Sequence, residues 1–300
     1  MSIRFDSRVA LVTGAGTGLG RSYALCLAER GANVIVNDLG SGIDGEGASA
    51  APAQRVANEI RSQGGRAIAN FDNVAEPDGA QRMVQEALDT FGRLDIVINN
   101  AGILRDKSFH KMQLEDFEVV LRVHLLGSVY VTKAAFLFMR QQAYGRIVLT
   151  TSASGLFGTF GQTNYCAAKL GLVGFMNALK HEGARYNILV NSVAPLAATR
   201  LGEPSGIFSP ELQQRLTPEL VTPLVAYLCS ETCTASGMIL TAGGGYFARD
   251  EVVEGLGVRF DAKTEVTPEM VAERWEEVIN TTGAHGFASS YDQIAEAVHP

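Results

Sequence analysis

The chain has 300 residues, of which 46% are hydrophobic and 19% charged, a composition typical of a globular protein and unlike that of a disordered one. Its 25 basic and 32 acidic side chains give a net charge of −7, which disfavours nucleic acid and anionic lipid as partners. Four cysteines in a chain of this length do not form a disulfide framework, so we expect a cytoplasmic protein. The longest uncharged stretch, 147–168, is rich in Ser, Thr and Gly, so no membrane span is expected there.

Short apolar runs rich in Val and Ile alternate along the chain with longer segments of helical spacing. The apolar runs show no in–out alternation, which is typical of strands that are buried on both faces of a parallel sheet. We therefore predict an α/β fold, a doubly wound, seven-stranded parallel sheet (Rossmann-like) with a C-terminal extension. The expected strands are 9–12, 33–36, 67–69, 94–98, 146–150, 188–193 and 238–240, and the expected helices are 19–30, 48–63, 78–91, 115–142, 164–185 and 219–229.

The pattern changes after the glycine run 243–245. We predict a Rossmann-like, NAD-binding catalytic domain over residues 1–247 and an extension over residues 248–300. A single helix is expected in the extension, at 268–279, with Thr267 as its N-cap and a proline in the first helical position. Because about fifty residues are too few to enclose a core, we expect the extension to pack on the domain or on a neighbouring subunit.

The first strand leads into a glycine-rich turn and then into a helix. Gly14, Gly18 and Gly20 let the backbone approach a phosphate at the helix amino terminus, where free N–H groups favour negative charge. Asp38 ends the second strand eighteen positions beyond Gly20. Its carboxylate is expected to accept hydrogen bonds from the adenosine ribose and to repel a 2′-phosphate, which favours NAD over NADP; alternatively, it caps a surface turn.

Further candidates follow the third and fourth strands, at the sheet edge where open α/β sheets bind ligands. Taken alone, the polar stretch 99–102 fits an ordinary turn as well as it fits a ligand site. The residues expected to hold the cofactor at these turns are Gly14, Thr17, Gly18, Leu19, Gly20, Asp38, Asp72, Asn73, Val74, Asn100, Ala101 and Gly102.

The fifth strand ends beside Ser152, and Tyr165 and Lys169 follow four positions apart, on one face of a predicted helix. This set suits interconversion of an alcohol and a ketone. A tyrosine with a pKa of about 10 acts as a base near pH 7 only after stabilisation by about 4 kcal/mol, which a nearby ammonium and a positive nicotinamide ring can supply. Ser152 is expected to bind the substrate oxygen and Lys169 to hold the nicotinamide ribose as well. Alone, such a Tyr–Lys pair is more often a surface pair.

Together these residues resemble the short-chain dehydrogenase/reductase family. The spaced glycines, the Asn-Asn-Ala-Gly run at 99–102, Ser152 and the Tyr165-x-x-x-Lys169 pair occur in the family's order between residues 5 and 247. Within the family, the chain is similar to the dehydrogenase domains of peroxisomal multifunctional β-oxidation proteins. The segments that carry this closer similarity include 36–40, 101–106, 122–125, 144–147, 151–155 and 165–171.

The resemblance implies oxidation of a (3R)-hydroxyacyl-CoA to the 3-oxoacyl-CoA with NAD, in a homodimer or homotetramer. Two positions depart from the family's pattern. His124 stands where the family often has an asparagine of the proton relay, so it either serves that relay or is a structural, hydrogen-bonded histidine. The family's Pro-Gly after the sixth strand is replaced by Pro195-Leu196, and we expect Pro195, Ala198 and Thr199 to meet the cofactor.

Several alternatives stay open. The turn 105–107 is either a solvated loop or a clamp for coenzyme A, and no metal site is expected at Cys229 and Cys233. The same chemistry could act on a steroid or another small hydroxy or keto compound, whereas a dinucleotide sensor without catalysis would lack part of the Ser–Tyr–Lys set. The side chains that either line an acyl pocket or belong to the core are Phe157, Phe160, Leu196, Leu201, Ile207 and Phe208.

Overall fold

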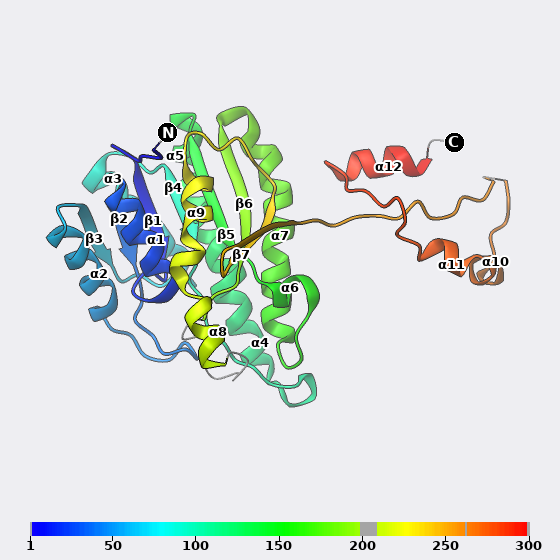
Figure 1. Cartoon of the computed structure of the whole chain (residues 1–300), viewed down its shortest axis with the longest axis horizontal. Coiled ribbons are helices and arrows are strands. Elements are labelled where there is room, and N and C mark those ends of the chain that lie inside the picture. The colour runs from blue at the N-terminus through cyan, green and yellow to red at the C-terminus, as the bar shows by residue number, and fades with distance from the viewer. Residues whose placement is uncertain (1, 199–208, 262, 299–300) are drawn as a thin grey trace. The chain divides into compact units, whose positions relative to one another are not determined.

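One sheet organises the chain, whose computed structural model describes residues 2–198, 209–261 and 263–298. Its strands are β1 (Val9–Thr13), β2 (Asn33–Asn37), β3 (Arg66–Asn70), β4 (Ile96–Asn99), β5 (Gly145–Thr150), β6 (Ile188–Pro195), β7 (Ile239–Gly243) and β8 (Tyr246–Asp250). They lie in the order β3-β2-β1-β4-β5-β6-β7-β8 (Figure 1). Neighbours from β3 to β7 run parallel. The chain reverses its direction of winding between β1 and β4, and open sheets bind ligands at such a point.

The sheet confirms the predicted doubly wound α/β fold and adds one strand to it. Each of the seven predicted strands is present and begins within two residues of the predicted position. The eighth strand, β8, was not predicted. Gly244 and Gly245, with φ of +60° and +82°, make a two-residue turn between β7 and β8. Because parallel neighbours need a much longer crossover, β8 runs antiparallel to β7.

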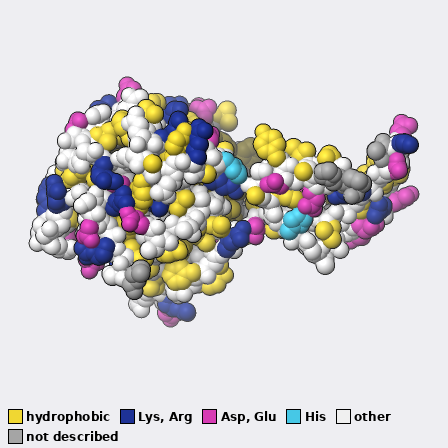
Figure 2. Space-filling view, turned by 90° about the horizontal axis from the view of Figure 1, so that it is seen from above, with side chains coloured by type: hydrophobic (Ala, Val, Ile, Leu, Met, Phe, Trp, Pro, Cys, Tyr) yellow, Lys and Arg dark blue, Asp and Glu magenta, His cyan; other side chains and the backbone are white. Residues whose placement is uncertain are grey.

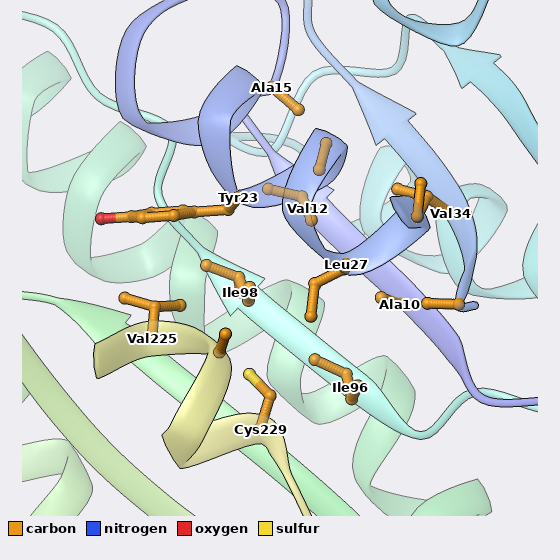
Figure 3. Packing of buried hydrophobic residues seen from close by; sticks show 14 of the residues in the cluster. Ala10, Val12, Ala15, Tyr23, Leu27, Val34, Ile96, Ile98, Val225 and Cys229 are labelled. Atoms are coloured by element: carbon orange, nitrogen blue, oxygen red, sulfur yellow. The ribbon is translucent and has the colours of Figure 1, made fainter. Parts of the chain in front are cut away.

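Helices cover both faces of the sheet, and each face has its own apolar core. The helices are α1 (Gly18–Glu29), α2 (Ala51–Ser62), α3 (Pro77–Phe91), α4 (Leu114–Leu121), α5 (Gly127–Gln142), α6 (Ala153–Phe157), α7 (Thr163–Gly183), α8 (Pro210–Arg215) and α9 (Thr222–Cys229), with 3₁₀ turns η1 (Phe109–Lys111), η3 (Ala184–Tyr186) and η5 (Pro218–Leu220) and a π turn η2 (Arg122–Leu126). Helices α1, α2 and α9 pack on one face, where Val12 and Ile98 of the sheet meet Leu27 and Cys229 (Figure 3). Helices α3, α5 and α7 pack on the other.

Helix α3 shows how the sequence sets these elements. Pro77 occupies its first turn, where no backbone N–H is needed, and Gly92 ends it with a φ of +76° that favours glycine. Ala80, Met83 and Val84 repeat at helical spacing and are buried against the sheet. Burial of a side chain of the size of Met83 contributes about 1.5–3 kcal/mol.

Two features of the molecule bear on membrane and nucleic-acid partners. The helical stretch Leu114–Gln142 is long and apolar enough to cross a membrane by length and composition, but Val131, Ala135 and Met139 within it are fully buried in the core. The apolar character of this stretch therefore has an explanation in packing.

On the face that Figure 2 shows, acidic and basic side chains are interspersed, in keeping with the net charge of −7.

Residues 250–300 form a second unit, distinct from the unit of residues 1–249, and the boundary lies two residues beyond the 247/248 division expected from the sequence. Its helices are α10 (Pro268–Glu273), α11 (Trp275–Val278) and α12 (Ser290–Val298). The Thr267 hydroxyl caps α10 as expected, whereas the predicted helix 268–279 is interrupted at Arg274 and α12 was not predicted. No side chain described in 250–298 is buried, so this part of the chain has no core of its own.

Candidate active site

The glycine turn between β1 and α1 is closely packed. A Cβ atom at Gly14 would lie 2.8 Å from the Cα of Ala101, and one at Gly20 would lie 2.3 Å from the carbonyl oxygen of Gly14. Gly14 also has a φ of +63°, which disfavours other residues. Only glycine therefore fits these two positions. The backbone of the turn and the amino terminus of α1 are left free to approach a phosphate group.

The Asn-Asn-Ala-Gly turn after β4 is tied to the glycine turn by Asn100 and Thr13. The Asn100 side chain donates to the carbonyl oxygens of Thr13 and Gly14, at 3.0 and 3.1 Å. The backbone N–H groups of Asn100 and Ala101 donate to the Thr13 hydroxyl, at 3.0 and 3.1 Å. Thr13 was not predicted as a site residue, although it precedes the glycines directly. The two turns thus form one rigid floor at the ends of β1 and β4.

Asp38 points back toward the glycine turn from the end of β2. One carboxylate oxygen accepts the Gly16 N–H at 2.8 Å, and the other accepts the Gly40 N–H at 2.7 Å. Both bonds come from backbone groups, which fixes the orientation of the carboxylate. Asp38 also lines the crevice beside the glycine turn, so its fixed negative charge faces whatever occupies that end of the crevice.

A crevice of about 290 Å³ joins these turns. Eleven of the predicted cofactor residues line it: Gly14, Thr17, Gly18, Leu19, Asp38, Asp72, Asn73, Val74, Asn100, Ala101 and Gly102. Gly20, Tyr165, Lys169, Pro195 and Ala198 are not among its lining residues. The lining residues that were not predicted are Asn37, Leu39, Ser41, Gly42, Gly45, Ala75, Ile103, Val119, Arg122 and Val123.

Ser152, Tyr165 and Lys169 are held at the carboxyl end of β5. Ser152 caps α6 and accepts the N–H of Ser154 at 3.1 Å. Lys169 on α7 is buried, and its Nζ donates to the Thr150 carbonyl oxygen at 2.6 Å and lies 5.5 Å from the centre of the Tyr165 ring. The structure therefore brings together the three residues that the sequence selected.

Burial dominates the electrostatics of this group. It raises the pKa of Tyr165 to about 12, while the neighbouring Ser152 hydroxyl acts in the opposite direction. It lowers the pKa of Lys169 to about 7. For the protein's side chains alone, desolvation of the phenolate therefore prevails, and the expectation that the Lys169 ammonium and a positive nicotinamide ring together lower this pKa stays a prediction. A further positive charge in the site is needed to make Tyr165 a base near neutral pH.

His124 lies in the π turn between α4 and α5. Its ring is buried and meets the Tyr165 ring edge to face, with the centres 5.1 Å apart. Its Nε2 lies 2.8 Å from the carbonyl oxygen and 3.1 Å from the backbone nitrogen of Ile103, and its Nδ1 is buried without a hydrogen-bond partner. A Cβ atom at Gly102 would lie 2.2 Å from this ring, so the glycine leaves the space for it. Burial and the nearby Lys169 charge lower the pKa of His124 well below its ordinary value.

The loop after β6 is described only in part. The Leu196 N–H donates to the Ala242 carbonyl oxygen at 2.7 Å, and the Ala198 N–H to the Leu216 carbonyl oxygen at 2.6 Å. Thr199, Leu201, Ile207 and Phe208 lie outside the described residues. Of the suggested acyl-pocket residues, Phe157 and Phe160 are 76% and 91% exposed, so neither belongs to the core.

The model of the short chain dehydrogenase family matches residues 8–202, which include both turns and the Ser–Tyr–Lys group. The chain belongs to this family. It is an oxidoreductase, and members of the family typically use NAD or NADP. Because the crevice requires glycine at the closely packed turn and carries a fixed carboxylate at the end of β2, its residues fit such a dinucleotide.

Its relatives include a protein of similar length and longer multifunctional proteins. A short-chain type dehydrogenase/reductase of Mycobacterium tuberculosis is 53% identical over 279 residues, 93% of this chain and 96% of the relative. Peroxisomal multifunctional enzyme type 2 of Mus musculus is 48% identical over 301 residues, 99% of this chain but 40% of the relative. The structure of full-length peroxisomal multifunctional enzyme type 2 from Drosophila melanogaster matches with a TM-score of 0.83 at 38% identity, over 99% of this chain and 49% of that chain. The chain thus spans about half or less of these multifunctional relatives.

Proposed function

We propose that this short-chain dehydrogenase oxidises a (3R)-hydroxyacyl-CoA to the 3-oxoacyl-CoA with NAD. The observation that carries the proposal is the grouping of Ser152, Tyr165 and Lys169 at the end of β5, in a chain that matches peroxisomal multifunctional enzyme type 2 over nearly its whole length. Relatives of this chain are named peroxisomal hydratase-dehydrogenase-epimerase, in Neurospora crassa, and 3-oxoacyl-[acyl-carrier-protein] reductase, in Synechocystis. Both names support a role in fatty acid metabolism.

The site's own residues suggest how the proton moves. Ser152 donates a hydrogen bond to the substrate oxygen and orients it beside Tyr165. The ionised Tyr165 takes the hydroxyl proton as the carbinol C–H bond breaks, so that the C–O bond becomes a carbonyl. A bound NAD supplies the acceptor for the hydrogen and its electron pair, together with the positive ring that the phenolate needs. Lys169 holds the nicotinamide ribose and passes the proton onward.

Asp38 favours NAD over NADP as the cofactor. Its carboxylate is held by two backbone N–H groups and faces the crevice, so it can accept the ribose hydroxyls but repels a 2′-phosphate. The expected consequence is a preference for NAD. The preference should weaken when this charge is removed.

We also propose that His124 takes the place of the relay asparagine. Its Nε2 lies 2.8 Å from the carbonyl oxygen and 3.1 Å from the backbone nitrogen of Ile103, so each ring tautomer finds a partner there. Nδ1 is buried without a hydrogen-bond partner, in a site where the Lys169 charge acts on the ring. In this role Nδ1 holds a water beside Lys169, as the relay asparagine would. His124→Asn is expected to keep most of the turnover and His124→Phe to lose it.

The assembly and location expected from the sequence stay predictions. We propose a homodimer formed by the long helices, because Leu137 on α5 and Leu170 on α7 are 54% and 47% exposed. A solution mass of one 32.0 kDa chain would contradict this. The extension is proposed to pack on the catalytic unit or on a neighbouring subunit. A cytoplasmic location is not supported by the relatives, several of which are named as peroxisomal proteins.

Steady-state assays with NAD test the substrate assignment. The substrates are (3R)- and (3S)-hydroxyacyl-CoA of matched chain length, a 17-hydroxysteroid and a small secondary alcohol. Turnover of the (3R) thioester well above that of its (3S) isomer is expected. Negligible turnover of every thioester with good turnover of the steroid or the small alcohol would replace the proposal by the same chemistry on another substrate.

A further inference from the structure

The loop between β2 and α2, residues 38–50, forms one wall of the dinucleotide crevice. Leu39, Ser41, Gly42 and Gly45 all line the crevice. The loop is closed on itself by backbone bonds, from the Gly42 N–H to the Glu46 carbonyl oxygen at 2.8 Å and from the Ser49 N–H to that of Leu39. A structureless connection of this length is uncommon in a compact domain and is often functional.

The tip of this loop is fastened by the turn that follows β4. The Leu104 N–H donates to the Ile43 carbonyl oxygen at 2.9 Å. Arg105 donates from Nε to the Asp44 carbonyl oxygen at 2.6 Å and from an Nη to the Glu46 carboxylate at 2.5 Å. These are charge-assisted bonds from one guanidinium, whose planar fork holds the tip in a defined orientation.

The Arg105 turn is in turn anchored to the catalytic helix. The Arg105 carbonyl oxygen accepts the Asn164 side-chain N–H at 3.1 Å, and Asn164 is fully buried and also accepts the N–H of Tyr165. A further guanidinium nitrogen lies 3.6 Å from the Asp116 carboxylate on α4. The Arg105 side chain, 26% exposed, is thus engaged by three protein groups, while the two alternatives for the turn 105–107, a solvated loop or a coenzyme A clamp, stay predictions.

We propose that Arg105 is a positioning residue that clasps the tip 43–46 over the bound dinucleotide and so sets how long the dinucleotide is retained. This rests on the proposed dinucleotide site. The tip belongs to the wall that continues from Asp38, so the clasp acts on the adenosine half of the ligand. Loss of the clasp leaves Ser152, Tyr165 and Lys169 in place, because none of them contacts the loop through a described bond.

Binding of NADH and of ADP-ribose to Arg105→Met is the test. Loss of charge-assisted bonds to the tip is expected to raise the Kd for both ligands about tenfold, mainly through faster dissociation, as measured by titration and stopped-flow displacement. The KM for NAD should rise by a similar factor, whereas kcat at saturating NAD should change much less. Arg4→Met, which removes an exposed arginine paired with Asp6, is the matched control and should bind both ligands like the wild type.

Glu46→Gln is a second variant that tests the same clasp even if Arg105→Met does not fold. The Glu46 side chain is 74% exposed, so its replacement keeps the fold, and it should raise the Kd for NADH about threefold by weakening one bond of the clasp. Faster hydrogen exchange confined to residues 40–50 is expected in both variants. Wild-type affinity for NADH in both variants would overturn the clasp and leave the proposed function standing. Failure of the wild type to bind NADH or ADP-ribose would overturn both.

Discussion

Lys169→Met is expected to make the protein more stable while it abolishes turnover. Lys169 is 3% exposed, and burial lowers its pKa from 10.5 in the unfolded chain to about 7 in the fold. The unfolded chain therefore binds more protons than the folded one between pH 7 and 10.5, and the stability of the wild type rises with pH across this window. Methionine has a similar length and no charge, so it removes the penalty.

The size of the effect follows from the two pKa values. The charged lysine costs about 4 kcal/mol at pH 7, but only about 1 kcal/mol at pH 9.5, where the unfolded chain is also losing its proton. The Thr150 carbonyl oxygen loses its hydrogen-bond partner in the variant, and this loss cancels about 1 kcal/mol of the gain in stability at every pH. The net gain is therefore about 3 kcal/mol at pH 7 and close to zero at pH 9.5.

Denaturant unfolding of both proteins at the two pH values measures this difference. The free energy of unfolding of the variant should exceed that of the wild type at pH 7, and the gap should close as the pH rises. A variant that is less stable than the wild type at pH 7, or a difference in free energy of unfolding that does not change with pH, would show that burial of the Lys169 charge does not destabilise the fold.

Three other outcomes are expected. Asp38→Ala should reduce the ratio of kcat/KM for NAD to that for NADP at least tenfold, and an unchanged ratio would place the discriminating charge elsewhere. For His124, an Asn variant with no more activity than the Phe variant, or an unaltered pH profile of kcat in both, would assign the ring a structural role only. Asp95 is fully buried beneath Arg8 and Arg93, so Asp95→Asn should lower the free energy of unfolding by about 3 kcal/mol, with the fluorescence midpoint shifting to less denaturant; equal midpoints would contradict this.

The parallel sheet was predictable because its strands are buried on both faces. Runs such as Val9–Val12 and Ile188–Val193 have no polar face, and only a sheet covered by helices on both sides accommodates them. The eighth strand was missed because Tyr246–Asp250 carries no such run, and its pairing depends on the turn at Gly244 and Gly245.

The residues of the site were predictable where local sequence determines the geometry. A glycine turn and a Tyr–Lys pair four positions apart are recognisable in one stretch of chain. The clasp at Arg105 was not, because it joins two loops about sixty residues apart, at Asp44 and Glu46. No local pattern marks such a contact.

The π turn and the electrostatics were also beyond the sequence. The stretch 114–142 keeps a helical pattern throughout, so nothing marks the turn at Arg122–Leu126 that brings His124 to Tyr165. The direction of the pKa shift of Tyr165 depends on how far burial outweighs the nearby groups. The fold decides that balance, whereas the spacing of residues in the sequence does not.

The most direct test of the account compares catalysis and cofactor binding in Tyr165→Phe. Removal of the phenolic oxygen should abolish the formation of NADH from (3R)-hydroxyacyl-CoA at every pH while the Kd for NADH stays within about twofold of the wild type. Turnover that survives in this variant with a normal pH profile would mean that another group takes the substrate proton.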